Sequence, residues 1–227
     1  MCHSIPASCT GTMMGMMEES KNNARQALFR PDWPQYDKPS AIVTLGHYYP
    51  KEGRVEANNR VQEERGAYRV KEERVVRQNL GWTQLINALT EERQWPLKRL
   101  FALLDPMLEP DIALAVVPTH LAYQAFWPVR TLARQLAENG RGDATTCLVR
   151  HTTIRRITFG GPSTKALHRE TIRVEEPHLV AGKRVLLLDD IAKSGASLIA
   201  CRELLLEAGA TVVQAMALGR VIVQRAE

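Results

Sequence analysis

The stretch from Val185 to Leu198, VLLLDDIAKSGASL, limits the folds open to this chain more than any other part of the sequence. Four consecutive apolar residues are typical of a parallel strand that is covered on both faces. Two acids, Asp189 and Asp190, follow this run, and small residues then lead into a helix that we expect over residues 196–208. We therefore expect the two acids at the carboxyl end of a strand in an open α/β sheet, where such sheets bind ligands.

The small residues between the strand and the helix are suited to an anion. Ser194, Gly195 and Ser197 let the backbone approach a ligand closely, and the N–H groups at a helix start favour a negative charge, most simply a phosphate. The two carboxylates would accept hydrogen bonds from a diol or hold Mg²⁺ through oxygen ligands. The alternative is an acidic turn without a ligand, but the apolar run, the acid pair, the loop and the helix start occur together.

The same stretch resembles the PRPP-binding motif of type I phosphoribosyltransferases, where PRPP is phosphoribosyl pyrophosphate. That motif is a hydrophobic strand followed by Asp-Asp, two apolar residues and Thr-Thr-Gly-x-Thr. Ser194 and Ser197 keep the hydroxyls of the threonines, whereas Lys193 departs from the motif. Its charge would either tighten anion binding or mark a non-catalytic relative. The resemblance implies that the 5′-phosphate is held by Lys193, Ser194, Gly195, Ala196 and Ser197. It also implies that Asp189 and Asp190 bind the ribose hydroxyls and meet the Mg²⁺ that enters with PRPP.

The rest of the chain fits one α/β domain behind an extension. Strands are expected at residues 112–117, 145–149, 184–188 and 211–218, and helices at 82–89, 97–104, from Pro128, and 196–208. Alternating strands and helices predict a parallel sheet with flanking helices, as in type I phosphoribosyltransferases. We expect residues 1–80 to form an N-terminal extension, serving as a hood or a partner-binding region, and residues 81–227 to form the phosphoribosyltransferase-like domain.

A long polar insert, residues 150–177, separates the second and third strands and is rich in basic side chains. A link of this length is typical of a lid or binding loop, and a solvated hairpin is the alternative. Type I enzymes carry a flexible basic hood here, and the layout looks most like the ComF-type branch. The resemblance implies that pyrophosphate is reached by one or more of Arg155, Arg156, Lys165 and Arg169. It further implies that the loop after the first core strand, Pro118, Thr119 and His120, grips pyrophosphate through backbone amides, although His120 is equally well explained as a turn residue.

The expected reaction is displacement of pyrophosphate from PRPP by a nitrogenous acceptor, which would make the chain a phosphoribosyltransferase. The acceptor is unidentified, and any hood that recognises it must come from residues 1–80, where a strand at 41–45 and a turn at 46–50 are expected. The alternative function is a non-catalytic PRPP- or nucleotide-binding regulator or partner in a nucleic-acid-linked pathway. A homodimer also stays open.

Charge, aromatic content and cysteine usage limit the ligands, metal sites and cellular compartment that we expect. The 227 residues carry a net charge of +5, which suits an anionic substrate, while the 6% aromatic content does not favour nucleic-acid binding. Cys147 and Cys201 are expected as buried thiols, and Cys2, His3 and Cys9 fit no structural zinc pattern. We expect a cytoplasmic protein that has no contact with a membrane, because no apolar run is long enough to span one.

Overall fold

The computed structural model describes residues 42–49, 81–155 and 164–221, and its centre is a parallel sheet. The strand order is β1-β8-β7-β3-β4, and β2 pairs with β8 beyond β1. These strands are β1 (Val43–Thr44), β2 (His47–Tyr48), β3 (Ala113–Val116), β4 (Gly142–Asp143), β7 (Arg184–Ala192) and β8 (Val212–Val221). A separate antiparallel pair is formed by β5 (Leu148–Arg150) and β6 (Ile172–Val174).

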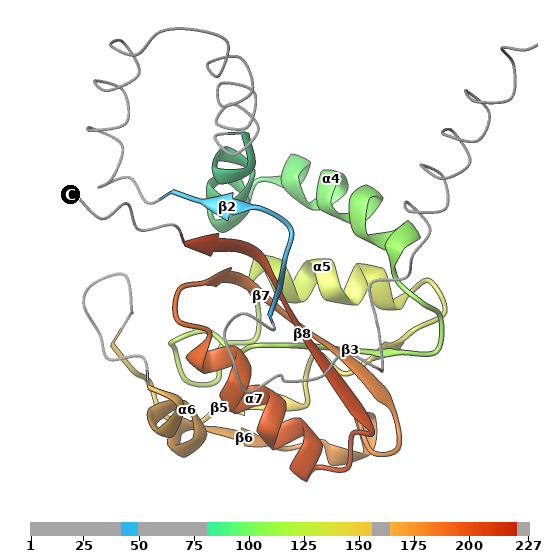
Figure 1. Cartoon of the computed structure of the whole chain (residues 1–227), viewed down its shortest axis with the longest axis vertical. Coiled ribbons are helices and arrows are strands. Elements are labelled where there is room, and N and C mark those ends of the chain that lie inside the picture. The colour runs from blue at the N-terminus through green and yellow to red at the C-terminus, as the bar shows by residue number, and fades with distance from the viewer. Residues whose placement is uncertain (1–41, 50–80, 156–163, 222–227) are drawn as a thin grey trace, which may run out of the picture.

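Helices cover both faces of the sheet (Figure 1). One face packs against the helical residues 81–90, α4 (Gln94–Leu104) and α5 (Pro128–Ala137), and α4 continues into the 3₁₀ turn η3 (Asp105–Met107). The other face packs against α7 (Ala196–Glu207). α6 (Lys165–Thr171) lies beside α7, and the short 3₁₀ helix η5 (Pro177–Leu179) precedes β7. This arrangement confirms the predicted α/β fold with a parallel sheet and flanking helices.

The alternation of side chains along β7 shows why both faces are apolar. Leu186 and Leu188 belong to the core cluster under α4 and α5, whereas Val185 and Leu187 belong to the cluster under α7. Successive side chains of a strand point to opposite faces, so an unbroken apolar run is what a strand covered on both sides requires. The predicted helices at 82–89, at 97–104, after Pro128 and at 196–208 are confirmed within a few residues.

Two predictions about strands are wrong in detail. Asp189 and Asp190 lie inside β7, which runs on to Ala192, because the ten-residue β8 continues to pair with it past the end of β3. The strand expected at 145–149 is not part of the parallel sheet, whose edge is the shorter β4. β5, which overlaps that range, instead pairs with β6.

The insert at 150–177 and the expected turn at 46–50 also differ from the prediction. The insert contains α6 and β6, so its described part is not structureless, while residues 156–163 lie outside the described residues. Residues 47–48 form β2 rather than a turn, because they pair with β8 at Arg220 and Val221. The strand expected at 41–45 is confirmed as the shorter β1.

Residues 42–49 therefore join the central sheet although they come from the N-terminal 80 residues. Trp82 Nε1 donates to the carbonyl of Leu218 at 2.6 Å, and Tyr48 Oη donates to Asn87 Oδ1 at 2.9 Å. These bonds connect β2, the helical residues 81–90 and β8 at the end of the sheet where β7 leads into α7. The boundary at residue 80 stays a prediction, but a piece of the extension is built into the domain.

Candidate functional site

The acid pair lies where β7 passes beyond the end of β3. Both residues are half-buried, and each carboxylate accepts a backbone N–H: Asp189 Oδ1 from Asp190 at 2.9 Å and Asp190 Oδ1 from Ile191 at 2.7 Å. Ser197 Oγ donates to Asp189 Oδ2 at 3.3 Å, which ties the start of α7 to the pair. Burial and the neighbouring Asp190 charge raise the pKa of Asp189 well above its ordinary value. The pair therefore holds a proton more readily than two isolated carboxyls would.

The loop before α7 presents backbone donors beside this pair. Gly195 has φ 79°, a left-handed conformation that glycine adopts without strain, and it turns the chain into α7. The first backbone bond of the helix runs from Ile199 N to Gly195 O at 2.9 Å, and Ala196 N donates to Ser194 Oγ at 3.3 Å. Within the described part of the chain, no hydrogen bond takes up the N–H groups of Ser197 and Leu198. Such donors at the start of a twelve-residue helix suit a phosphate.

The loop after β3 leaves the neighbouring strand at the same edge of the sheet. β3 and β7 pair directly, and Val117 N donates to Leu188 O at 2.9 Å just before both loops begin. Pro118 is buried, while Thr119 and His120 are half-buried. The structure thus brings the predicted pyrophosphate loop, Pro118, Thr119 and His120, to the edge that carries Asp189 and Asp190.

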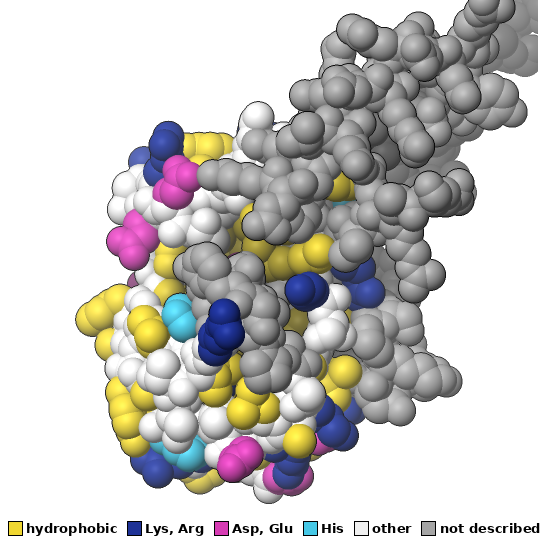
Figure 2. All heavy atoms as spheres, turned by 90° about the vertical axis from the view of Figure 1, so that its left-hand side faces the viewer, with side chains coloured by type: hydrophobic (Ala, Val, Ile, Leu, Met, Phe, Trp, Pro, Cys, Tyr) yellow, Lys and Arg dark blue, Asp and Glu magenta, His cyan; other side chains and the backbone are white. Residues whose placement is uncertain are grey.

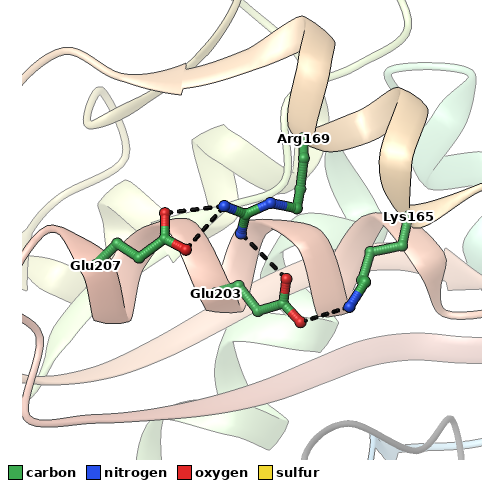
Figure 3. Close-up of polar contacts among 4 residues, drawn as sticks. All are labelled: Lys165, Arg169, Glu203 and Glu207. Atoms are coloured by element: carbon green, nitrogen blue, oxygen red, sulfur yellow. Dashed lines mark hydrogen bonds and ion pairs between the residues drawn. The ribbon is translucent and has the colours of Figure 1, made fainter.

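The basic residues of the insert that we expected at pyrophosphate have different surroundings. Lys165 and Arg169 lie on α6 and form ion pairs with acids of α7 (Figure 3). Glu203 accepts from Lys165 at 2.9 Å and from Arg169 at 3.1 Å, and Glu207 pairs with Arg169 at 2.8 Å. Arg155 is exposed next to the loop after β3, and Arg156 lies outside the described residues. The described contacts direct Lys165 and Arg169 to α7, and none joins them to the acid pair.

Comparison with known proteins gives a family for the part of the chain that holds this site. The sequence model described as "Phosphoribosyl transferase domain" matches residues 120–225, which include the acid pair and the loop before α7. Residues 120–225 are therefore similar to a phosphoribosyl transferase domain. A crystal structure of purine phosphoribosyltransferase from Pyrococcus horikoshii Ot3 is similar at 14% identity and a TM-score of 0.29, covering 64% of this chain and 89% of that chain. No curated protein matches the chain.

Three residues within the matched segment were not predicted as site residues, namely Arg150, His168 and Thr171. All three are buried and bonded to one another beneath the loop at 118–120. The sequence carried one signal, because Arg150 stands two residues after Leu148 in a strand and so shares its buried side. The partners of Arg150 come from distant parts of the chain, and no local pattern indicates them.

A cavity of about 230 Å³ lies beside the loop after β3. Its walls include Pro118, Tyr123, Trp127, Arg130 and Glu176. Arg130 stacks over the Trp127 ring at 5.3 Å and donates to the Ala125 carbonyl at 2.6 Å. The cavity lies between the loop after β3, the start of α5 and the β5–β6 pair, and neither Asp189, Asp190 nor residues 193–197 line it.

The donor set of the domain suits a Mg²⁺ ion that arrives with its substrate. No group of three or more His, Cys, Asp or Glu side chains that could hold a metal is present in residues 42–49, 81–155 and 164–221. Asp189 and Asp190 offer two carboxylates whose Oδ1 atoms already accept backbone bonds. This fits Mg²⁺, which keeps several waters and is held by one or two carboxylates together with substrate phosphates.

The distribution of charged side chains and the apolar character of the helices are relevant to binding of nucleic acids and membranes. On the face in Figure 2, Lys and Arg side chains are spread among acidic, polar and hydrophobic ones rather than gathered into a stripe. A stripe of basic residues is what nucleic-acid binding ordinarily shows. None of the helices in the described residues has the length and apolar character needed to cross a bilayer. The suggested metal ligands Cys2, His3 and Cys9 lie outside the described residues.

Proposed function

We propose that this chain binds PRPP at the edge of the sheet formed by the loops after β3 and β7, and transfers phosphoribose to a nitrogenous acceptor. One observation carries the proposal. The N–H groups of Ser197 and Leu198 start α7 without an acceptor among residues 42–49, 81–155 and 164–221, directly beside the Asp189 and Asp190 carboxylates. Donors that suit a phosphate and acceptors that suit a diol therefore lie next to each other, which supports binding of a phosphorylated ribose.

Each group has a role in this reaction. A new bond forms between the acceptor nitrogen and the anomeric carbon, the bond to the pyrophosphate oxygen breaks with its electron pair, and the nitrogen gives up its proton. Residues 193–197 hold the 5′-phosphate, and Asp189 and Asp190 hold the ribose hydroxyls next to the positive charge that develops on the ring. In this proposal the backbone N–H groups of the loop at 118–120 receive the pyrophosphate, those of Thr119 and His120 being its donors because Pro118 has none, and Arg155 and Arg156 are expected to reach it from the insert.

Bound with PRPP, Mg²⁺ would neutralise charge on the pyrophosphate oxygens. Asp189 and Asp190 are the residues that would contact its water ligands. The buried free thiols Cys147 and Cys201 are compatible with the reducing cytoplasm in which we place the protein. Within the family we place the chain nearest to the ComF-type branch, on the layout of its basic insert.

A second function is favoured by a specific observation. Lys165 and Arg169, two of the four side chains expected at pyrophosphate, are engaged by Glu203 and Glu207. Lys193 is exposed and stands where the family motif has threonine. Both features suit a protein that binds PRPP or a nucleotide without turning it over, as a regulator or partner.

Calorimetry with PRPP and Mg²⁺ tests the shared ligand. We expect the wild-type chain to bind, and Asp189→Asn/Asp190→Asn to lose about tenfold or more in affinity. Asp111→Asn is the matched control, because Asp111 is exposed and precedes β3, whereas the site lies beyond the other end of that strand. Absence of binding, or equal affinity in the double variant, would contradict the proposal. Pyrophosphate release with a panel of nitrogenous bases then separates the enzyme from the regulator.

A further inference from the structure

Arg150, on β5, places a positive charge in the interior with only 2% of its surface exposed. Its three nitrogens all donate: Nε to the Thr119 carbonyl, Nη1 to Thr171 Oγ1 at 2.6 Å and Nη2 to His168 Nδ1 at 3.2 Å. A guanidinium has no acceptor, so Nδ1 of His168 must be the unprotonated nitrogen of a neutral ring. Burial, followed by the Arg150 charge, lowers the pKa of His168 to about 4, in agreement with a neutral imidazole.

Burying the charge of Arg150 has an unfavourable free energy unless the guanidinium finds partners. Among the described residues no carboxylate is within ion-pairing distance of Arg150, whereas the other deeply buried guanidinium, on Arg141, pairs with Asp105 at 2.7 Å. A buried charge without a counter-charge needs complete hydrogen bonding to be tolerated. Arg150 obtains three hydrogen bonds, one each to a carbonyl, a hydroxyl and an imidazole, which come from two segments of the chain, the loop after β3 and α6.

The segment that Arg150 holds is the loop after β3. Besides the side-chain bond to Thr119 O, the Arg150 carbonyl accepts from Tyr123 N at 2.9 Å. Two further hydrogen bonds join the same two segments of the chain. Ile154 N donates to His120 O at 3.0 Å, and Ala122 N donates to Thr153 Oγ1 at 3.0 Å. The loop is therefore fastened to residues 150–154 through Thr119, His120, Ala122 and Tyr123.

The hydrogen bond from Arg150 to the Thr119 carbonyl determines how the peptide after Thr119 is oriented. In a trans peptide the C=O of one residue and the N–H of the next point to opposite sides. A guanidinium that holds Thr119 O therefore directs the His120 N–H away from the interior. The orientation of this peptide depends on Arg150, whose own position depends on Thr171 and His168.

We propose that Arg150 is a positioning residue, which fixes the peptide between Thr119 and His120 so that the loop at 118–120 can receive the pyrophosphate of PRPP. The inference rests on the proposed function of that loop. Through its hydrogen bonds Arg150 acts on the pyrophosphate end of the substrate, because none of these bonds reaches residues 193–197, where the 5′-phosphate is expected. Its charge also interacts with Asp189, without a hydrogen bond between them.

The test compares three ligands by calorimetry on the full chain: PRPP with Mg²⁺, pyrophosphate with Mg²⁺, and ribose 5-phosphate. For Arg150→Met we expect affinity for PRPP and pyrophosphate to fall about tenfold or more, and affinity for ribose 5-phosphate to stay within about twofold. Arg150→Lys, which can replace one of the three bonds, should recover part of the loss. Thr171→Val, which removes one partner and keeps the charge, should show the same selective loss at smaller size and serves if Arg150→Met does not fold.

Arg141→Gln is the control for a purely structural arginine, and it should lower stability without any preference among the ligands. Equal losses for pyrophosphate and ribose 5-phosphate in Arg150→Met and Thr171→Val, or no loss for either ligand, would overturn the inference. These results differ from a failure of the proposed function, in which the wild-type chain itself binds none of the three ligands.

Discussion

Gly195 is the residue on which the shape of the phosphate loop depends. Its φ of 79° lies in the left-handed region, where a Cβ costs about 1–2 kcal/mol. We expect Gly195→Ala to lower the free energy of unfolding by about 1 kcal/mol and to weaken ribose 5-phosphate binding about fivefold or more. Calorimetry and urea denaturation measure the two effects.

Gly140 offers a matched control for that substitution. It has φ 77° and nothing within 4 Å of the position that a Cβ would take, and it follows α5 at the edge of the sheet opposite to the site. Gly140→Ala should therefore cost about the same stability, about 1 kcal/mol, with unchanged ligand affinity. A loss of affinity in both variants would show that the effect of Gly195→Ala on binding is a general consequence of destabilisation.

His168 makes the stability of the fold depend on pH. Its pKa is lowered to about 4 by burial and by Arg150, whereas a histidine in the unfolded chain titrates near 6.5. Between these values the unfolded state binds the proton and the folded state does not, so stability is lost as the pH falls through this window. We expect the advantage of the wild type over His168→Gln to shrink by roughly 1–3 kcal/mol between pH 7.5 and pH 4.

Urea denaturation of both chains at each pH checks this prediction, because the difference between them cancels the carboxyls that titrate over the same range. The glutamine amide oxygen can still accept from Arg150 Nη2 but does not titrate. A difference that is constant with pH would mean that His168 is protonated to the same extent in the folded and unfolded chains.

At the scale of elements, α6 is attached to α7 by a short network of charges. Glu203 has 28% side-chain exposure and pairs with both Lys165 and Arg169, so Glu203→Gln removes two ion pairs at once. We expect a loss of about 0.5–1 kcal/mol in the free energy of unfolding, decreasing in high salt, because partly exposed pairs are screened. Thermal denaturation at low and high NaCl concentration measures it.

Glu170 is the control on α6 itself, since it is exposed and makes no ion pair with the described residues. Glu170→Gln should stay within about 0.5 kcal/mol of the wild type at both salt concentrations. A loss of the same size in the two variants would indicate net charge rather than the specific pairs as the cause.

Some of these elements could be predicted from sequence and others could not, for physical reasons. The apolar run at 185–188 specified a buried strand, since its pattern is local and its meaning does not depend on partners. The end of β7 could not be predicted, because it depends on how far β8 continues beside it. The pairing of β5 with β6 and the contacts of Arg150 likewise join residues about twenty or more positions apart, and no periodicity in the chain records them.

Over the whole molecule, the N-terminal part is packed onto the sheet at a point of close approach. Gly219 of β8 lies under the helical residues 81–90, and a Cβ there would meet Ile86 Cδ1 at 2.5 Å and Tyr48 Cβ at 3.2 Å. Gly46 approaches Trp82 in the same way, with a Cβ position 2.6 Å from Cδ1 of the ring. These two glycines let β2, the helix and β8 come together, and β1 and β2 cover an edge of β8 that would otherwise be open to other strands.

Gly219→Ala tests whether this packing stabilises the domain as a unit. The added methyl group must displace Ile86 or Tyr48 from a well-packed contact, and overpacking of this kind costs about 1–3 kcal/mol. Gly81→Ala is the control, because nothing lies within 4 Å of its Cβ position, and it should change stability by less than about 0.5 kcal/mol. If residues 42–49 are part of the cooperative domain, urea denaturation of Gly219→Ala will show one transition shifted to lower urea. A separate early transition, with the main one unmoved, would instead mean that the N-terminal part unfolds independently of the sheet that carries Asp189 and Asp190.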